Sequence, residues 1–408
     1  QNTEQKADLE ACTVGIKGAG VLDFVAAWYI KATHYIRGTK ILCAFVSTNS
    51  ITQGEQVGVL WGWLLAQGIK IHFAHRTFQW SNEARGMAAV HCVIVGFALF
   101  DTNRKTIFEY PDIKGGGIPL QATNINPYLV DASDVIVESR RIPICRVPEI
   151  AFGSMQNDGG YLLLENTEKD ELIRSEPGSE KWIRPFLGSV EFINGLSRWC
   201  LWLIDIAPQE LRALPQISRR VACVKKHREE STRETTRELA NFPTRFGEIR
   251  QPNARYLAVP KTSSERRAYI PVALLDNTII ASTELFTVAG ATHYHFGVLT
   301  SAMHVSWARY VCGRLKSDFR YSAGIVYNNF PWPEAPSEAQ QQKIEAAAQG
   351  VLDARAEFTA ASLADLYAPL PTPPLLLSPH HHRAPPVHPP YGPTTILPDP
   401  PPPPPPFP

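Results

Sequence analysis

Two aromatic side chains lie between apolar stretches of the sequence, where they could stack on the flat ring of a substrate. The segment Ile71–Phe97 predicts a hairpin of two apolar strands, Ile71–His75 and Val90–Phe100, joined by a polar loop that carries Phe78 and Trp80. A loop of this kind at the edge of a sheet suits an enzyme that must stack a flat ring in its active site. The alternative is that both rings only pack against the fold, because amphipathic rings bury well in many places.

Cationic side chains gather in the second half of the chain. The stretch Ser197–Ile270 holds 15 Lys and Arg residues against 8 Asp and Glu residues, although the formal net charge of the whole chain is only +1. Within this stretch, Gln216–Ala240 predicts one long charged helix, and the turn Ser264–Arg267 follows it. Such a helix is either a solvated face or a phosphate-binding surface, and the local excess favours phosphate contact. The candidate phosphate-positioning residues are Arg219, Arg220, Lys225 and Lys226.

The elements that must position the aromatic residues follow a recognisable order. Apolar spacing in Gly20–Ile36 predicts a helix, and the apolar run Ile41–Ser47 is typical of a buried strand. Glu55–Gln67 predicts a second helix, which ends at Gly68 in the C-terminal capping position. Helix, buried strand, helix and hairpin together predict the second half of a doubly wound α/β sheet that finishes with an antiparallel pair.

The C-terminal part of the chain changes character twice. Ser337–Gln340 predicts a capping box that starts a helix running to about Phe358. Beyond Pro369 the sequence becomes rich in proline and histidine, which predicts an extended or disordered tail.

Composition limits the class of protein. With 408 residues, 44% hydrophobic and 19% charged, the chain is long enough for two folded units plus tails. Its seven cysteines are scattered without a C-x-x-C pair, which predicts a reducing cytoplasm and no metal site. No apolar run reaches the roughly 18 residues of a membrane span, and no signal peptide opens the chain. Because the chain begins with Gln1, we expect a fragment or a processed product.

Several stretches carry a resemblance to one family. GVLDFVAAWYIKAT, FVSTNSITQGEQVGVLW and IHFAHRTFQWSNEARGMAAVHCVIVGF resemble the C-terminal half of the catalytic domain in MmeI-like adenine-specific DNA methyltransferases. These are single-chain type IIL/IIG restriction-modification enzymes that fuse nuclease, methyltransferase and target-recognition domains. The later stretches RPFLGSVEFINGLSRWCLWL, TSSERRAYIP, YHFGVLTSAMHVSWARYVCGRL and YSAGIVYNNFPWPE resemble the target-recognition domain of that family, and SLADLY resembles its C-terminal segment.

The resemblance implies a fold and a division into domains. The fold class is α/β, with the C-terminal half of a class I (Rossmann-like) methyltransferase sheet, then an α+β target-recognition domain and a helical C-terminal segment. The implied boundaries are 1–100 for the catalytic half, 101–150 for a connector, 151–330 for target recognition, 331–368 for the helical segment and 369–408 for the tail.

The resemblance also implies the chemistry. The family transfers a methyl group from S-adenosyl-L-methionine to adenine N6, using a glycine-bearing loop and an Asn-Pro-Pro-aromatic motif that we expect upstream of Gln1. Phe78 is implied to stack on the extruded adenine, with Trp80 as a rival for that place. Asn49, which follows the strand Ile41–Ser47, is implied to lie near the mouth of the site, or else to form a turn.

The same resemblance suggests residues that read the DNA sequence. Arg pairs with guanine N7 and O6, and Glu accepts from cytosine N4, so both suit major-groove discrimination. The alternative for each Arg is a phosphate contact or a surface salt bridge. The candidate base-reading residues are Glu265, Arg266, Arg267 and Glu284.

These observations lead to three readings of function. The first is a fragment of a site-specific DNA adenine methyltransferase of a restriction-modification system, which acts on double-stranded DNA in the cytoplasm and is inactive alone. The second is a DNA-binding specificity module without catalysis. The third is a degraded reading frame, since the proline-rich tail resembles the product of a shifted frame.

Overall fold

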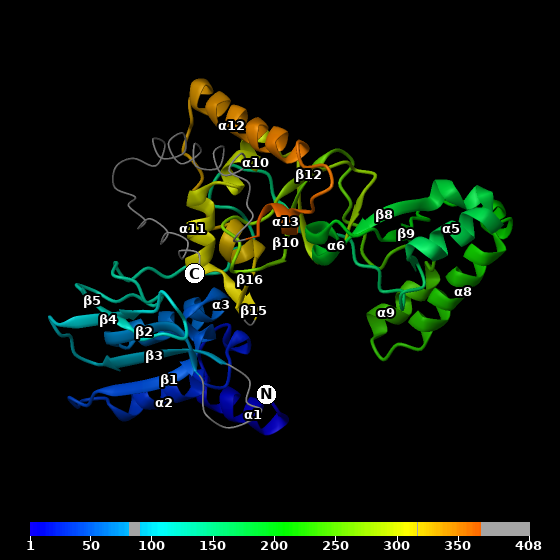
Figure 1. The fold of residues 1–408 in the computed structure, drawn as a ribbon. Coiled ribbons are helices and arrows are strands. Elements are labelled where there is room, and N and C mark those ends of the chain that lie inside the picture. Colours follow the sequence, from blue (N-terminus) through cyan, green and yellow to red (C-terminus); the bar gives the residue numbers. More distant parts are fainter. Residues whose placement is uncertain (81–89, 316, 369–408) are drawn as a thin grey trace. The chain divides into compact units, whose positions relative to one another are not determined.

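A computed structural model describes residues 1–80, 90–315 and 317–368 of the chain (Figure 1). The described residues form two compact units. Unit 1 comprises Gln1–Ile144 and Ser306–Phe330, and unit 2 comprises Cys145–Val305 and the described residues from Pro331 onward.

Unit 1 is built on a five-stranded sheet of order β1-β3-β2-β4-β5. Its strands are β1 (Cys43–Thr48), β2 (Lys70–Trp80), β3 (Val90–Ala98), β4 (Lys105–Glu109) and β5 (Ile118–Ala122). Strand β3 lies antiparallel to both β1 and β2, whereas β2 and β4 run parallel. Because β3 inserts between β1 and β2, those two strands point the same way. The predicted half of a doubly wound sheet that finishes with an antiparallel pair is confirmed.

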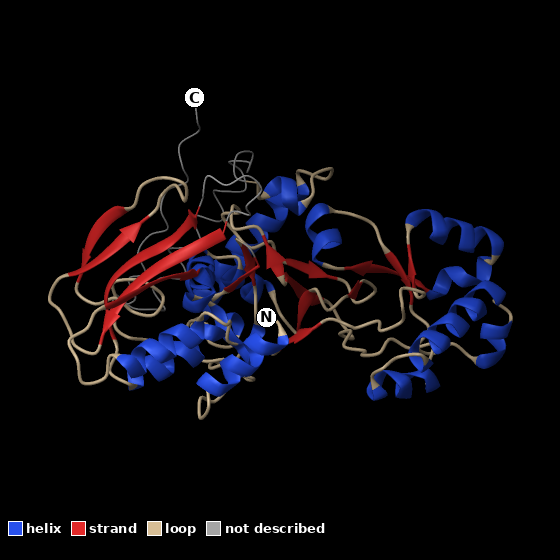
Figure 2. Ribbon diagram, turned by 90° about the horizontal axis from the view of Figure 1, so that it is seen from below, coloured by secondary structure: helices blue, strands red, loops and turns tan. Residues whose placement is uncertain are grey.

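Helices of unit 1 lie alongside this sheet (Figure 2). Their apolar side chains share one core with those of the strands. The helical elements before β2 are α1 (Thr3–Cys12), η1 (Ala19–Val21), α2 (Ala26–Tyr35), η2 (Asn49–Thr52), α3 (Gly54–Gln56), the π-helical turn η3 (Val57–Trp61) and α4 (Gly62–Ala66). At the centre of the core, the ring of Tyr29 lies 5.4 Å from that of Phe97 and 6.0 Å from that of Trp61. Gly68 follows α4 with φ +89°, which confirms the predicted glycine cap.

Strand β2 is longer than the sequence predicts. Phe78 and Trp80 lie within the strand, in register with β3, and not in the loop that follows. The strand continues because its backbone keeps finding partners on both sides: the Gln79 N–H, for example, donates to the Ile113 carbonyl at 2.7 Å. The remaining part of the predicted loop, 81–89, lies outside the described residues.

Two segments that follow residue 100 also lie in unit 1. The predicted connector contains β4 and β5, which extend the sheet. The end of the predicted recognition domain also returns to unit 1, because the Arg140 N–H donates to the Gly324 carbonyl at 3.0 Å and the Asn328 side chain donates to the Arg140 carbonyl at 2.8 Å. The elements of that returning segment are β15 (Gly313–Leu315), β16 (Asp318–Arg320) and the π-helical turn η6 (Ala323–Tyr327).

Unit 2 combines two four-stranded sheets with surrounding helices, of order β12-β10-β14-β6 and β13-β8-β9-β7. The strands are β6 (Ile150–Phe152), β7 (Leu163–Leu164), β8 (Ile183–Leu187), β9 (Trp199–Leu201), β10 (Tyr256–Pro260), β11 (Thr262–Ser263), β12 (Ala273–Leu275), β13 (Ile280–Ala281) and β14 (Leu285–Ala289). The helical elements are α5 (Asn166–Ser175), η4 (Pro177–Trp182), α6 (Ser189–Asn194), α7 (Pro208–Arg212), α8 (Pro215–Glu229), α9 (Glu234–Glu238), η5 (Leu239–Asn241), α10 (His293–Leu299), α12 (Glu338–Ala356) and α13 (Leu363–Leu366). Helix α11 (Ala302–Val311) contains the boundary between the units.

The strands and helices of unit 2 enclose separate cores. Helices α5 and α8 lie around β8 and β9, away from β10 and β12 (Figure 1). Apolar residues of α8 pack in the core of β8 and β9, whereas β10 and α6 share another core. The α+β organisation predicted for the recognition part is therefore confirmed.

The predicted charged helix Gln216–Ala240 is in fact two helices. Helix α8 ends at Glu229 and α9 begins at Glu234. The break is stabilised at Ser231, whose hydroxyl accepts from the Arg233 N–H at 3.2 Å and whose carbonyl accepts from the Arg237 side chain at 2.9 Å. Serine competes for backbone partners in this way, which favours a turn over continued helix.

The C-terminal helix starts where the sequence predicts. The Ser337 N–H donates to Gln340 Oε1 at 2.8 Å, and the Gln340 N–H donates to the Ser337 hydroxyl at 3.3 Å, which completes the capping box of α12. Ile344, Ala348 and Val351 are buried on its inner face. The predicted tail, 369–408, lies outside the described residues.

Candidate functional site

Aromatic rings from β2 and from the end of β4 gather on one face of the unit 1 sheet. The ring of Phe78 stacks on that of Tyr110 at 5.1 Å, with 23° between the ring planes. His75 stacks on Phe108 at 4.1 Å, with planes only 4° apart. Trp80 lies 6.1 Å from Phe78 and remains 46% exposed. Both predicted stacking residues therefore belong to one aromatic cluster.

A bulge in β2 makes this gathering possible. Three residue steps on β2, from His75 to Phe78, oppose two steps on β3, from Ile94 to Cys92. Side chains alternate between the faces of a regular strand, so His75 and Phe78 would point to opposite sides without the extra residue. The bulge turns Phe78, and Trp80 after it, to the face that His75 occupies.

A hydrogen bond joins two members of the cluster. The Tyr110 hydroxyl lies 2.7 Å from His75 Nδ1. Burial lowers the pKa of His75, so its ring is neutral near pH 7. Burial also raises the pKa of Tyr110, so its hydroxyl keeps its proton. Between two neutral groups the donor depends on which ring nitrogen of His75 carries the proton, and in either case the bond holds Tyr110 in place beneath Phe78.

Asn49 lies close to the same part of β2. Its side chain is buried, and Nδ2 is 3.4 Å from Thr77 Oγ1, directly before Phe78. Asn49 is also the first residue of η2, and its carbonyl accepts from the Thr52 hydroxyl at 2.9 Å. The structure thus brings Asn49 and Phe78 to neighbouring positions, while the alternative role of Asn49 in a turn is also present.

The candidate base-reading residues lie at loops beside β11 and β14. Arg266 is exposed in the turn closed by the bond from the Arg267 N–H to the Ser264 carbonyl, whereas Glu265 and Arg267 are partly buried. Glu284 is exposed directly before β14, and its carboxylate lies 3.4 Å from Lys261 Nζ, three residues before that turn. These candidates therefore belong to the β10 and β14 part of unit 2.

The candidate phosphate-positioning residues occupy α8, in the other part of unit 2. Arg219 is exposed, and Lys225 and Lys226 pair weakly with glutamates one helical turn later, at 3.8 Å each. Arg220 is engaged within the fold: its guanidinium donates to Glu168 at 2.8 Å and to two backbone carbonyls at 3.2 and 3.3 Å. The hydrogen bond from the Glu165 N–H, and after it the one from Arg220, lower the pKa of Glu168. Arg220 therefore fastens α8 to the rest of unit 2.

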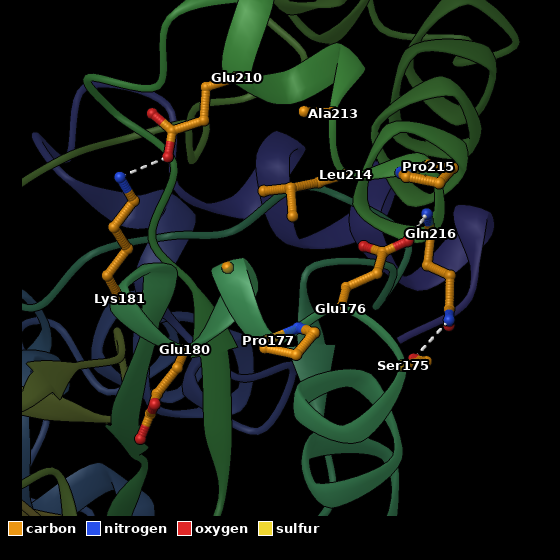
Figure 3. A pocket seen from close by; sticks show the side chains of 11 residues that line it. Ser175, Glu176, Pro177, Glu180, Lys181, Glu210, Ala213, Leu214, Pro215 and Gln216 are labelled. Carbon is orange, nitrogen blue, oxygen red and sulfur yellow. Dashed lines mark hydrogen bonds and ion pairs between the residues drawn. The ribbon is translucent and has the colours of Figure 1, made fainter.

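A pocket of about 960 Å³ lies in unit 2 between the end of α5 and the start of α8 (Figure 3). Its walls include Glu176, which accepts from the Gln216 N–H at 2.5 Å, and the ion pair of Lys181 with Glu210. None of the predicted site residues lines this pocket. We assign no function to it.

Metal-binding groups and disulfides are absent from the part of the chain that the structure describes. No group of three or more His, Cys, Asp or Glu side chains is placed there to hold a metal ion, and its cysteines are all free. Among those residues, no helix is both long and apolar enough to cross a membrane.

The fold combines a half sheet that ends in an antiparallel pair, aromatic rings on one face of that sheet, and an α+β unit that follows in the chain. This combination defines the class as the C-terminal half of a class I methyltransferase joined to a recognition unit. Family models match the chain in the same order. They are the MmeI DNA-methyltransferase domain over residues 1–109, the MmeI target recognition domain over 131–334 and the MmeI C-terminal domain over 336–395. The chain belongs to the MmeI family of DNA methyltransferases, which confirms the resemblance.

Two relatives show how similar the chain is to known proteins and how much of their length it covers. DNA methyltransferase A of Bacillus subtilis (strain 168) is 41% identical over 373 residues, which cover 91% of this chain and 42% of that protein. The type IIL restriction-modification enzyme MmeI, solved in complex with DNA, is 48% identical with a TM-score of 0.90, covering 97% of this chain and 53% of that one. The chain therefore spans about half the length of these relatives.

Proposed function

We propose that this chain is part of a site-specific DNA methyltransferase that transfers a methyl group from S-adenosyl-L-methionine to adenine N6 in double-stranded DNA, within a restriction-modification system. The observation that carries the proposal is the shared face of β2 and β4, where the Phe78 ring stacks on that of Tyr110. The Asn49 amide lies 3.4 Å from the hydroxyl of Thr77, the residue before Phe78. A domain that matches a target recognition model follows in the same chain.

The proposed role of this face is to hold an extruded base. Adenine N6 is a poor nucleophile, because its lone pair is delocalised into the ring, so catalysis depends on orientation and electrostatics. A half-buried Phe78 presents one ring face to a base while Tyr110 supports the other. Trp80 is the more exposed ring and remains the alternative stacking residue.

S-adenosyl-L-methionine supplies the methyl group in this proposal. We assign no residue of this chain to the cofactor and derive no step through it. Since the chain spans about half the length of its relatives, we propose that the cofactor site and the groups that accept the N6 hydrogens lie in the part that the relatives have in addition. The chain alone is then expected to be inactive.

Calorimetry with S-adenosyl-L-methionine tests this division. The chain alone is compared with a chimera that carries, at its N-terminus, the part of the B. subtilis relative that precedes the matching region. We expect binding and methyl transfer to adenine by the chimera only. Cofactor binding by the chain alone would place the cofactor site among its own residues, and methylation of cytosine in place of adenine would overturn the proposed substrate.

A second candidate function is a DNA-binding specificity module without catalysis. It is favoured by the extent of the target recognition match, which covers residues 131–334. Sequence-selective binding of duplex DNA by the chain alone, with a chimera that binds cofactor but methylates nothing, would support this candidate over the first.

A further inference from the structure

An exposed phenylalanine stands at the edge of a unit 2 sheet. Phe152 ends the edge strand β6 and is 41% exposed, whereas its neighbour Phe286, at 4.8 Å on β14, is buried. The backbone after Phe152 is closely packed: the Gly153 N–H donates to the Leu285 carbonyl at 2.9 Å, and a Cβ on Gly153 would lie 2.3 Å from the Ser282 carbonyl oxygen. A well-held backbone therefore carries an apolar ring that is in contact with solvent.

Two cations from different segments approach that ring. Lys261 Nζ lies 5.4 Å from the ring centroid, and the Arg250 guanidinium lies 5.9 Å from it. Both distances fall within the range of attraction between a cation and a π system. The two side chains start from fixed points, since the Lys261 N–H donates to the Glu284 carbonyl at 3.0 Å and the Arg250 N–H donates to the Ser154 hydroxyl at 3.0 Å.

Each cation also has a carboxylate partner at the surface. Lys261 pairs with Glu284 at 3.4 Å, and Arg250 pairs with Glu248. With two cations and two carboxylates, the patch has no net charge, so it does not attract a polyanion from a distance. Surface ion pairs of this kind contribute little to stability, and a phosphate can therefore replace a carboxylate at small cost. The arrangement suits a short-range contact of defined geometry.

We propose that Phe152, Lys261 and Arg250 form a contact for the sugar-phosphate backbone of DNA. Lys261 and Arg250 bind phosphate oxygens, and the Phe152 ring packs against a deoxyribose. The contact adjoins Glu284, a candidate for base reading: when that carboxylate turns to a cytosine amino group, Lys261 is released to the phosphate. This inference rests on the proposed function, in that the chain must bind duplex DNA.

Fluorescence anisotropy of a labelled duplex, measured with the full chain at several salt concentrations, tests the contact. Each phosphate contact contributes about 0.9 to the slope of log K against log salt. We expect Lys261→Gln and Arg250→Gln each to lower the slope by about 0.9, and the double variant by about twice that amount. Phe152→Ala should weaken binding about fivefold with the slope unchanged, because it removes only apolar contact.

Matched variants separate this contact from general loss of charge or fold. Lys169→Gln is the control, because Lys169 also lies over an aromatic ring: its Nζ is 4.3 Å from the centroid of Trp199. The Lys169 side chain is 21% exposed, and that of Lys261 is 20% exposed. The control should leave the slope unchanged, and Lys261→Arg should retain the wild-type slope. An unchanged slope in a folded double variant would overturn the inference. If the wild-type chain binds no duplex, the proposed function fails and not this contact alone. The titration of the wild type shows that result without any variant.

Discussion

Replacing Arg228 by Met should strongly destabilise the α8 part of unit 2. The Arg228 side chain is fully buried, and its guanidinium group acts only as a donor. Its five N–H bonds reach five different backbone carbonyls. The acceptors are Asn157 at 2.8 Å, Leu239 at 3.1 Å, Phe242 at 2.9 Å, Gln156 at 3.1 Å and Arg245 at 2.8 Å. One side chain thus ties α8 to three other stretches of chain.

The expected magnitude follows from the acceptors that lose their donor. Methionine fills much of the volume but donates nothing. The Gln156, Leu239 and Phe242 carbonyls still accept from backbone N–H groups, whereas the Asn157 and Arg245 carbonyls lose the guanidinium. An orphaned buried polar group costs about 1 to 3 kcal/mol, so these two together cost about 2 to 6 kcal/mol. This is a large part of the stability of a domain, which is about 5 to 15 kcal/mol.

Urea denaturation followed by tryptophan fluorescence measures this effect. Arg219→Met, on the exposed side of the same helix, serves as the control and should change the free energy of unfolding by less than about 0.5 kcal/mol. Arg228→Lys should fall between the two, because an ammonium group has only three donors. If Arg228→Met unfolds within about 1 kcal/mol of Arg219→Met, the five-bond reasoning is refuted.

Three further predictions concern other parts of the chain. Burial lowers the pKa of His304 to about 3, so the folded state keeps the ring neutral while the unfolded state takes up a proton below about pH 6.5. As the pH falls between these values, the free energy of unfolding of the wild type should decrease by about 1.4 kcal/mol per pH unit more than that of His304→Gln. Unfolding measured at a series of pH values checks this difference. In the methyltransferase chimera, a radiolabel assay should show that Phe78→Leu lowers the rate of methyl transfer at least tenfold, on the order of one lost stacking contact, and that Trp80→Leu lowers it much less. A larger effect of Trp80→Leu would assign the stacking role to Trp80. Strand β1 is an edge strand whose Val46 is 49% exposed, and an unpaired apolar edge favours pairing with another copy of the chain. Val46→Lys should therefore give less self-association than the wild type in sedimentation velocity, and equal association would contradict this reasoning.

Local signals were enough to predict much of unit 1. The strand Ile41–Ser47 and the glycine at position 68 are set by neighbouring residues, and both correspond to observed features, β1 and the end of α4. The same holds for Ser337, whose capping box depends on a residue three positions away. The placement of Phe78 was predicted only in part, because the bulge that turns it toward Tyr110 depends on the register with β3. Ring contacts between strands distant in sequence leave no local pattern.

The cations of α8 show which signal the sequence offers. Ile217, Val221 and Val224 recur at helical spacing, and Arg228 falls four residues after Val224 on the same buried face. An arginine on an apolar face must find acceptors within the fold, because burying an unpaired charge is costly. Charge counting alone treats Arg228 as equivalent to the exposed Arg219, whereas the helical phase of the amino-acid sequence is sufficient to separate the two. The DNA-contact candidates on α8 are therefore the cations that the helical phase leaves outside, and of these Arg220 is already held by Glu168.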